Sequence, residues 1–427
     1  MLNVYPTYKD SGIEWLGQIP THWEMLKAKY MFQKNKREVQ DGDKVITCFR
    51  DGQVTLRENR RTTGFTESIT EIGYQGIRKG DLVIHQMDAF AGAIGVSDAD
   101  GKGTSVYHCC TPKGEYLTYY YAHVIREMAL KGYIQSLYRG IRERSSDFNY
   151  VTFGNCLLPV PSPSEQRQIV AYLDYKSNKI NERICQRERE LQTLSELKQA
   201  EIAAVVTRGL DPNVPMKESG IEWLGKIPAH WEVRKIKNCL QERSEKGYPN
   251  EPILCATQSR GVIPQDMYDN RVVVVNKDFD KLKLVKCGDF VISLRSFQGG
   301  IEYAYYQGII SAAYTILTPK DKRNSEYFKH LFKSHDFIQL LQTCVTGIRE
   351  GQNINYAMLA KHFIPIPPIE EQQKIVLYIK NRLYVIDEYI AKLKAEINYL
   401  QEYKQRLISD VVTGKVDVRG VEIPNEE

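Results

Sequence analysis

The chain has 427 residues, of which 42% are apolar, 10% aromatic and 26% charged, as in an ordinary globular protein of two or three domains. No run approaches the roughly 18–20 apolar residues of a membrane helix, and the N-terminus lacks the basic and apolar segments of a signal peptide. We therefore expect a cytoplasmic protein. The net charge of +5 is compatible with a polyanionic partner but too small to indicate one.

One segment of the chain occurs twice. Residues 10–24 read DSGIEWLGQIPTHWE and residues 218–232 read ESGIEWLGKIPAHWE, so 12 of 15 positions are identical at an offset of 208. Further matching pairs follow at offsets of 208 to 206: GDLVI with GDFVI, GIRE with GIRE, and LLPVPSPSEQRQIVAYL with FIPIPPIEEQQKIVLYI. These matches at a nearly constant offset show that the chain is a tandem duplication of a unit of about 205 residues. A repeat of this length indicates that the fold itself is repeated.

Each unit begins with about 150 residues of mixed strand and helix pattern. Short β-branched and aromatic runs bounded by Gly, Asp and Asn predict strands, for example at 45–49, 81–84 and 271–275. Two longer segments, 116–128 and 326–341, predict helices. A cluster of prolines then follows this part of each unit and marks a boundary, since proline disfavours helix in the residues before it.

A long helix is predicted after each proline cluster, the first one opening at Ser164. The second helix repeats apolar residues at alternating spacings of 3 and 4, with one polar interruption: Val376, Ile379, Leu383, Ile386, Ile390, Leu393, Ile397, Leu400, Lys404, Leu407 and Val411. The first helix has the same register 206 residues earlier, with a more polar seam. Such seams are typical of coiled coils, and antiparallel pairing of the two helices would return the chain to the first unit.

The predicted fold class is therefore α+β: two similar heads separated by two long antiparallel coiled-coil helices, with pseudo-twofold symmetry. The heads are placed at residues 1–162 and 209–368, and the helices at 163–208 and 369–427, the latter range including a C-terminal tail. The segment after Thr207 leads into the second copy of the Trp-Leu-Gly motif, whereas the segment after Thr413 ends at residue 427. We therefore expect Thr413 to lie beside residues 10–23, as Thr207 lies beside residues 218–231.

No catalytic motif is recognisable. The chain has no phosphate-binding loop, dinucleotide fingerprint, His-Glu-x-x-His helix or Asn/Asp-Pro-Pro-Tyr/Phe motif, and its nine cysteines form no Cys-x-x-Cys pair. His22 and His230 are matched in the repeat, but a packing role suits them better than metal ligation. The sequence predicts a binding or scaffolding subunit that holds neither metal nor cofactor.

The doubled Trp-Leu-Gly-x-Ile-Pro-x-His-Trp-Glu motif, the doubled proline segment running into Glu-Gln-x-x-Ile-Val, and the helices ending in Val-Val-Thr resemble the DNA-specificity subunits of type I restriction–modification enzymes. The resemblance covers nearly the whole chain. It implies two target-recognition domains that read the halves of a bipartite, asymmetric site in double-stranded DNA. It also implies two adenine methyltransferase subunits as partners, which hold S-adenosylmethionine, and further restriction and translocation subunits.

DNA-contacting residues are predicted from the repeat itself. Residues that are identical in both halves should have the same role in each, such as phosphate contact, whereas residues that differ should contact the bases. The candidates are Arg57, Arg60, Arg61, His85, Gln86, Asp88, Arg142, Arg144, Gln258, Ser259, Arg260, Arg295, Ser296, Arg349, Gln352 and Asn353. For Arg142 and Arg349, in the shared GIRE, a salt bridge with the neighbouring glutamate is an equal alternative.

All four tryptophans, Trp15, Trp23, Trp223 and Trp231, lie in the repeated motif. They are candidates for docking the methyltransferase, with core packing at the junction of head and helix as the simpler interpretation. Two other functions stay open at this point. The chain could be a coiled-coil adaptor that binds proteins without reading DNA, or a nuclease of an unrecognised type.

Overall fold

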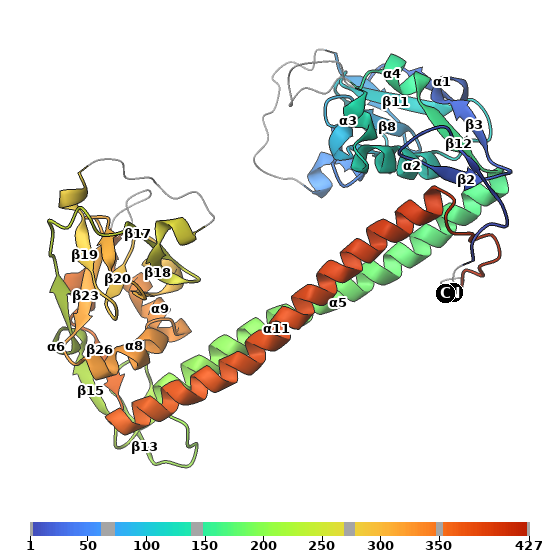
Figure 1. Ribbon diagram of the computed structural model, residues 1–427. Helices are drawn as coiled ribbons and strands as arrows, with labels where there is room; N and C mark the ends of the chain where they lie inside the picture. The colour runs from blue at the N-terminus through green and yellow to red at the C-terminus, as the bar shows by residue number, and fades with distance from the viewer. Residues whose placement is uncertain (1–2, 61–72, 138–147, 269–277, 347–352, 425–427) are drawn as a thin grey trace. The chain divides into compact units, whose positions relative to one another are not determined.

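The computed structural model describes residues 3–60, 73–137, 148–268, 278–346 and 353–424. The chain forms two compact units, one made of Met1–Gln186 with Glu396–Glu427 and the other of Arg187–Ala395 (Figure 1). Each unit contains a head, part of the first long helix and part of the second. The functional division of the chain at residues 162, 208 and 368 stays a prediction.

The first head is built on a four-stranded antiparallel sheet. Its strand order is β4 (Phe32–Asn35), β11 (Tyr107–Pro112), β8 (Leu82–His85) and β9 (Ile94–Val96). Side chains alternate between the two faces of a strand, and here both faces are buried. Leu82 and Ile84 pack with residues of α2 (Thr118–Leu130), whereas Val83 packs on the opposite face.

That opposite face is covered by two antiparallel strand pairs, the hairpin of β5 (Ile46–Cys48) with β6 (Val54–Leu56) and the pair of β7 (Gln75–Ile77) with β10 (Gly101–Gly103). Because both faces of β8 are covered, the run Asp81–Leu-Val-Ile is continuously buried, as the apolar sequence predicts. The predicted strands at 45–49 and 81–84 are confirmed within a residue or two.

The second head repeats this arrangement strand for strand. Its sheet has the order β16 (Leu240–Arg243), β23 (Thr315–Pro319), β20 (Phe290–Ile292) and β21 (Glu302–Tyr303). The covering ladders are β17 (Leu254–Thr257) with β18 (Gly261–Pro264) and β19 (Lys283–Val285) with β22 (Gly308–Ile310). The predicted strand at 271–275 lies outside the described residues.

The helix predicted at 326–341 is wrong as a single element. The chain forms α8 (Ser325–Leu331) and α9 (His335–Thr343), with a break between them. The physical reason is tertiary: the carbonyl of Phe332 turns away to accept the backbone N–H of Ile301 (3.3 Å), and Ser334 starts the next helix in extended conformation.

Smaller elements also correspond between the heads. In the first head they are β1 (Tyr8–Asp10) with β2 (Gln18–Pro20), β3 (Glu24–Lys27) with β12 (Leu157–Val160), α1 (Ala28–Met31) and α4 (Tyr150–Asn155). In the second head they are β13 (Met216–Glu218) with β14 (Lys226–Pro228), β15 (Glu232–Lys235) with β26 (Phe363–Ile366), α6 (Ile236–Cys239) and α10 (Tyr356–Leu359).

The shared Gly-Asp motif has a structural explanation. Asp81 accepts the backbone N–H of Arg78 (2.9 Å) and pairs with Arg37, while Asp289 accepts the N–H of Lys286 (2.7 Å) and pairs with Arg243 at 2.7 Å. Both aspartates are buried, so each arginine compensates a charge that would otherwise be costly. The aspartate that GDLVI and GDFVI share therefore forms a buried ion pair in both heads.

The two long helices are α5 (Pro163–Arg208) and α11 (Ile369–Val412). The first begins at Pro163, one residue before the predicted Ser164. Ser162 lies at its N-terminus and accepts the backbone N–H of Glu165 with its hydroxyl (3.3 Å). Proline suits the first helical position because its missing N–H would have no partner there.

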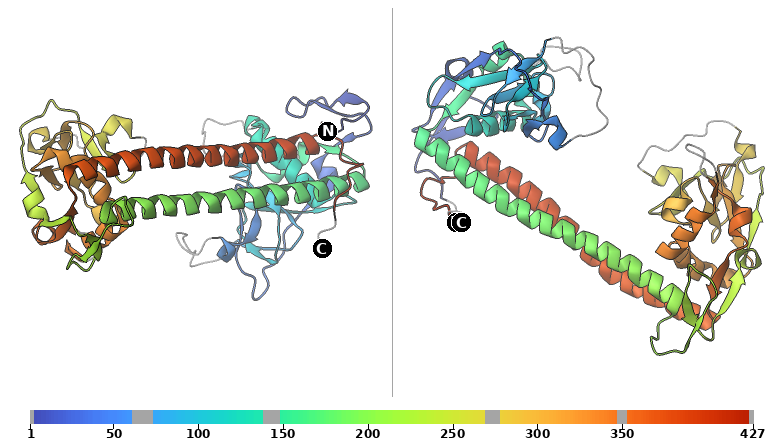
Figure 2. Two further views of the ribbon diagram at one scale, coloured as in Figure 1. Left: turned by 90° about the horizontal axis from the view of Figure 1, so that it is seen from below. Right: turned by 180° about the vertical axis from the view of Figure 1, so that it is seen from behind.

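Within each unit α5 and α11 lie side by side and antiparallel (Figure 2). In the first unit Asn181 contacts Lys404 (2.9 Å) and Arg183 contacts Glu396 (3.4 Å). The residue numbers on α11 thus decrease as those on α5 increase, as in an antiparallel pair. In the second unit the same order holds in contacts of Glu190 with Tyr389, Lys198 with Asp387 and Glu201 with Arg382.

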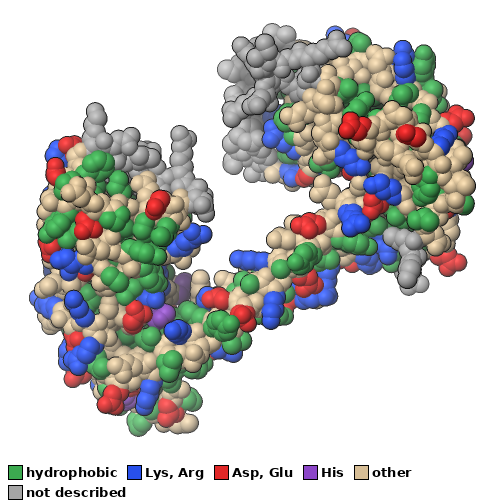
Figure 3. Space-filling model, viewed as in Figure 1, with side chains coloured by type: hydrophobic (Ala, Val, Ile, Leu, Met, Phe, Trp, Pro, Cys, Tyr) green, Lys and Arg blue, Asp and Glu red, His purple; other side chains and the backbone are tan. Residues whose placement is uncertain are grey.

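Six positions of the predicted seam are buried in α11: Ile379, Ile386, Leu393, Ile397, Leu407 and Val411. Ile375 and Val412, beside the seam at the two ends of the helix, are buried as well. The α+β class and the antiparallel helix pair are confirmed. Charged side chains of both signs are interspersed along the solvent-facing surface of the helices (Figure 3).

Each head holds the C-terminal end of the helix that starts in the other half of the sequence. The Tyr120 hydroxyl donates to the Val412 carbonyl (3.0 Å), and the matching Tyr327 hydroxyl donates to the Val206 carbonyl (2.6 Å). A β-bridge also joins Asn3 to Asp417.

The glycines that follow these helices show the same equivalence. A Cβ atom on Gly414 would lie 3.0 Å from the ring of Trp23, and one on Gly209 would lie 3.4 Å from the ring of Trp231. The prediction that the segment after Thr413 returns beside residues 10–23 is therefore confirmed.

Candidate nucleic-acid interface

In the first head, two turns come together at one end of the sheet. One is the turn between β5 and β6, residues 49–53, and the other connects β8 to β9, residues 86–93. Arg50 of the first turn pairs with Asp88 of the second, Nη2 to Oδ1, at 2.8 Å. The two turns carry or adjoin most of the DNA candidates of this head.

Arg60 and Arg57 follow the hairpin in the short 3₁₀ turn after β6. The Arg60 guanidinium stacks 4.2 Å above the Phe49 ring and pairs with Asp51 at 2.7 Å and Gln53 at 3.1 Å. Arg60 is exposed, so this cation is held in a defined place while its outer surface faces solvent. Such fixed, exposed arginines suit contact with phosphate or guanine.

His85, Gln86 and Asp88 form the start of the second turn. The backbone N–H of Asp88 donates to His85 Nδ1 (3.1 Å), and the ring of His85 packs edge-on against Tyr107. Burial lowers the pKa of His85, with the Asp88 carboxylate opposing this effect. His85 is therefore the neutral acceptor at neutral pH, and it shapes the turn that presents Asp88.

The second head has matching turns with different side chains. Residues 258–260, between β17 and β18, are all exposed, and Arg260 donates from Nη1 to the Met267 carbonyl (3.0 Å). Arg295 is exposed at the start of α7 (Ser296–Gly299), in the turn after β20. Ser296 is buried, and its hydroxyl accepts the Ser293 N–H (2.8 Å), so this serine shapes the turn.

Asn353 is exposed in β25 (Asn353–Ile354), which pairs with β24 (Val345–Thr346). Five further candidates lie outside the described residues: Arg61, Arg142, Arg144, Arg349 and Gln352. DNA contact by any of the sixteen candidates stays a prediction.

Sequence reasoning missed two cations behind the turns. Arg126 Nη1 donates to the carbonyls of Arg50 (3.1 Å) and Gly92 (2.5 Å), and burial lowers the pKa of Arg126. Lys333 Nζ donates to the carbonyls of Gln258 (3.3 Å) and Gly299 (2.8 Å). A signal in the sequence is that both positions are basic at an offset of 207, the same offset that relates the identical pairs Tyr120 and Tyr327 and His123 and His330.

The tryptophans lie at the junctions of heads and helices. Trp23 and Trp231 are fully buried, in cores that include Val412 and Val206 respectively. The Trp231 indole N–H donates to Glu371 (3.0 Å) at the start of α11. Packing at the junction is thus what Trp23 and Trp231 do in this structure, and docking of a partner by the tryptophans stays a prediction.

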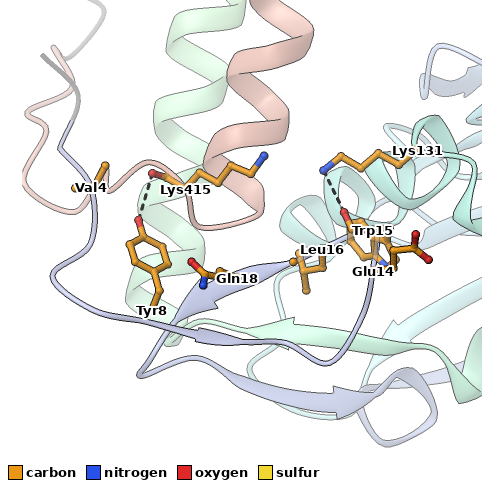
Figure 4. A pocket seen from close by; sticks show the side chains of 9 residues that line it. Val4, Tyr8, Glu14, Trp15, Leu16, Gln18, Lys131 and Lys415 are labelled. Atoms are coloured by element: carbon orange, nitrogen blue, oxygen red, sulfur yellow. Dashed lines mark hydrogen bonds between the residues drawn. The ribbon is translucent and has the colours of Figure 1, made fainter.

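Trp15 borders a pocket of about 510 Å³ in the first unit (Figure 4). Lys131 donates to the Trp15 carbonyl (3.2 Å), and the Tyr8 hydroxyl donates to the Lys415 carbonyl (3.3 Å), so the pocket joins the head to the end of α11. Its opening beside Trp15 offers a concave surface at the junction.

No helix in the described ranges is both long and apolar enough to cross a membrane. Across the same residues, no group of three or more His, Cys, Asp or Glu side chains is arranged to hold a metal ion.

Known proteins with similar sequences share one description. A family model described as the type I restriction modification DNA specificity domain matches residues 228–399. The putative type I restriction enzyme MjaX specificity subunit of Methanocaldococcus jannaschii is 23% identical over 432 residues, covering 95% of this chain and 96% of its own. The MjaVIII specificity subunit of the same organism is 23% identical over 293 residues, covering 63% of this chain and 64% of its own.

A solved structure has the same fold. A chain from a study described as the structural basis of complex assembly and conformational transition of the type I R-M system aligns with a TM-score of 0.65. The identity is 16%, and the alignment covers 92% of this chain and 98% of that chain.

Two similar heads joined to a pair of long antiparallel helices are thus a fold that this chain shares with a solved chain from a study of a type I R-M system. Residues 228–399 thus match the type I restriction modification DNA specificity domain, and most of the chain is similar to a putative type I restriction enzyme specificity subunit.

Proposed function

We propose that this chain reads a bipartite, asymmetric site in double-stranded DNA, one half with each head, and directs adenine methyltransferase subunits and restriction subunits to it. The observation that carries the proposal is the pair of equivalent turns in each head. Residues 49–53 and 86–93 correspond to residues 258–260 and 293–301 on the same sheet framework, but their side chains differ. A shared framework with different reading turns is what two different half-sites require.

The duplication of the head also supports tight DNA binding even where each head alone has a modest affinity for DNA. Once one head is bound, the second contact is intramolecular, so its effective concentration is high. The net charge of +5 adds a sequence-independent attraction to phosphates, which should weaken with salt.

Exposed apolar side chains on α11 are the proposed surface for the methyltransferase subunits. In the second unit Leu377, Tyr384 and Val385 are 59%, 63% and 59% exposed, and in the first unit Tyr399 and Tyr403 are 70% and 52% exposed. Residues four or seven apart share a helix face, so these side chains form patches. Tyrosine is favoured at interfaces because its apolar ring carries a polar tip.

S-adenosylmethionine belongs to the methyltransferase partners in this proposal, and this chain binds no cofactor. The test is purification of the chain alone and together with its methyltransferase subunit, followed by mapping of methylated adenines in genomic DNA. We expect methylation at one bipartite sequence only when both are present.

Methylation by the chain alone would contradict the division of labour. A complex that assembles but methylates and binds DNA without sequence preference would instead support the adaptor alternative.

A further inference from the structure

The two cations behind the reading turns occupy equivalent places in the heads. Arg126 lies in α2 and Lys333 lies between α8 and α9, at an offset of 207 in the sequence. Each side chain is half-buried and reaches under the sheet edge to two backbone carbonyls. One carbonyl comes from the hairpin turn and the other from the turn between the two sheet strands.

In the first head the contact is close. Arg126 Nη1 lies 3.1 Å from the Arg50 oxygen and 2.5 Å from the Gly92 oxygen. A Cβ on Gly52 would lie 2.3 Å from Arg126 Nη1, so the guanidinium occupies the space beside this glycine. Gly92 has a φ of 87°, a left-handed conformation that brings its carbonyl into reach.

In the second head the same connection is made by an ammonium. Lys333 Nζ lies 3.3 Å from the Gln258 oxygen, 2.8 Å from the Gly299 oxygen and 2.6 Å from Glu302 Oε1. Hydrogen bonds from a charged donor to carbonyls are stronger than neutral ones, particularly when partly buried.

One equivalent position on the neighbouring strand differs between the heads together with the length of the hairpin turn. Strand register places Gly95 opposite Val83 and Glu302 opposite Val291, so these two residues are equivalent. At Gly95 a Cβ would lie 1.9 Å from the Gly52 carbonyl oxygen, because the five-residue turn of the first head fills that space. The three-residue turn of the second head leaves room for Glu302, which pairs with Lys333.

We propose that Arg126 and Lys333 are positioning residues for sequence readout. Each cation holds two turns at a fixed separation and thereby sets which base edges its head accepts. The proposal rests on the function proposed above, in which these turns face DNA. Neither cation needs to touch DNA, since its hydrogen bonds go to backbone carbonyls of the turns.

The test uses the full chain in complex with its methyltransferase subunit and selection from duplexes randomised in both half-sites. Arg126→Met should reduce base preference roughly tenfold in the half-site read by the first head and leave the other half unchanged, as expected for loss of well-placed base contacts. Lys333→Met should give the mirror-image result. Arg126→Lys and Lys333→Arg keep the cation and should restore preference to within about threefold of wild type.

Matched controls are Lys113→Met in the first head and Lys283→Met in the second. Each lysine donates to a backbone carbonyl away from the reading turns, Lys29 and Tyr314 respectively (both 2.7 Å). Both variants should keep the preference of wild type in both half-sites. If Arg126→Met does not fold, Arg126→Gln also removes the charge and shortens the side chain, and it should relax the same half-site.

Unchanged preference in Arg126→Met and Lys333→Met would overturn the proposal, as would equal relaxation of both half-sites by either variant. A wild-type complex without any sequence preference would instead contradict the proposed function. The two failures are therefore distinguishable in one experiment.

Discussion

Two glutamates at the starts of the long helices each accept hydrogen bonds from the head, but from different partners. Glu165 accepts the Tyr5 hydroxyl at 2.6 Å and lies 3.0 Å from His22 Nε2. Glu371 lies 2.7 Å from His230 Nε2 and accepts the Trp231 indole N–H at 3.0 Å. Both carboxylates occupy the first turn of a helix, where the helix dipole favours negative charge.

Removing the Tyr5 hydroxyl should show how much its hydrogen bond to Glu165 contributes to the stability of the protein. Glu165 is 3% exposed, so in Tyr5→Phe its carboxylate loses a buried hydrogen bond, and we expect a destabilisation of roughly 1.5–3 kcal/mol. Urea unfolding followed by circular dichroism measures it. Tyr119→Phe, at a 44% exposed tyrosine of the same head, is the control and should change stability by less than about 0.5 kcal/mol. Equal effects of the two changes would contradict the prediction.

Glu302 should make the second head sensitive to pH. Burial raises the pKa of Glu302 to about 7, although Lys333 acts to lower it. Between pH 4.5 and 7 the unfolded state loses this proton before the folded state does, so stability falls as pH rises through that window. The loss is on the order of 3 kcal/mol, at 1.36 kcal/mol for each pKa unit.

The measurement is the unfolding midpoint of wild type and Glu302→Gln at several pH values from 4.5 to 7.5. The glutamine variant should lose less stability over this range than wild type. Glu370→Gln, at an exposed glutamate, should keep the slope of wild type. Parallel curves for wild type and Glu302→Gln would show that this carboxyl does not control the pH dependence.

At the scale of elements, the helix pair is stabilised along one stripe and presents another to solvent. In the second unit Ile386 and Leu393 are 5% and 2% exposed, whereas Tyr384 is 63% exposed two residues from Ile386. The seven-residue spacing of the buried positions keeps them on the side facing α5. Pairing and partner binding can therefore be separated by mutation.

Ile386→Ala and Leu393→Ala should each destabilise the protein by about 2–5 kcal/mol, because each creates a cavity in the helix seam. Tyr384→Ala should change stability little, yet it should weaken association with the methyltransferase subunit. Thermal unfolding and size-exclusion chromatography of the mixture measure the two effects. A Tyr384→Ala protein that unfolds as early as Ile386→Ala would place this tyrosine in the seam instead.

At the scale of the whole molecule, each unit is completed by a segment distant in the sequence. Val418 is fully buried in the core of the first unit, and Gln168 of α5 donates to the carbonyls of Val418 (3.1 Å) and Val421 (2.7 Å). The first unit is therefore assembled from two separate segments of the chain, whereas the second unit is continuous from Arg187 to Ala395.

A circular permutant tests this equivalence. Joining residue 427 to residue 1 through a short flexible linker and opening the chain between Pro212 and Pro215 should yield a protein that folds and binds DNA with its partners. The new ends fall in an exposed connection, where permutation is best tolerated. Removal of residues 414–427 is the contrasting variant and should destabilise the first unit. A permutant that fails to fold would contradict the equivalence of the two connections.

The length of the helices should set the spacing of the two half-sites. Insertion of one heptad after Leu194 and one after Leu400 preserves the phase of the seam and adds roughly 10 Å of helix. This corresponds to about three base pairs of DNA at ~3.4 Å each. Both half-sequences should be kept while the spacer between them changes or the site is lost. Methylation mapping that finds the original spacer would show that the helices do not set it.

Much of the architecture is predictable from the sequence because the repeat exposes it. The doubled motifs give the two heads, and the spacing from Val376 to Val411 gives the helix seam and its pairing. The break at residues 332–334 and the role of Ser296 were not predictable. Both depend on hydrogen bonds to residues far away or to a locally folded turn, which leave no periodic signal.

The sequence by itself determined that this protein is a duplicated α+β chain with a coiled-coil pair and no recognisable catalytic motif, since repeats and apolar periodicity are local patterns. Only the tertiary structure decided that Arg126 and Lys333 connect the reading turns, and that Tyr120 and Tyr327 hold helix ends contributed by the opposite half of the chain. Those contacts join residues that are 34 to 292 positions apart. Burial and strand register, rather than any sequence pattern, bring such residues within hydrogen-bonding distance.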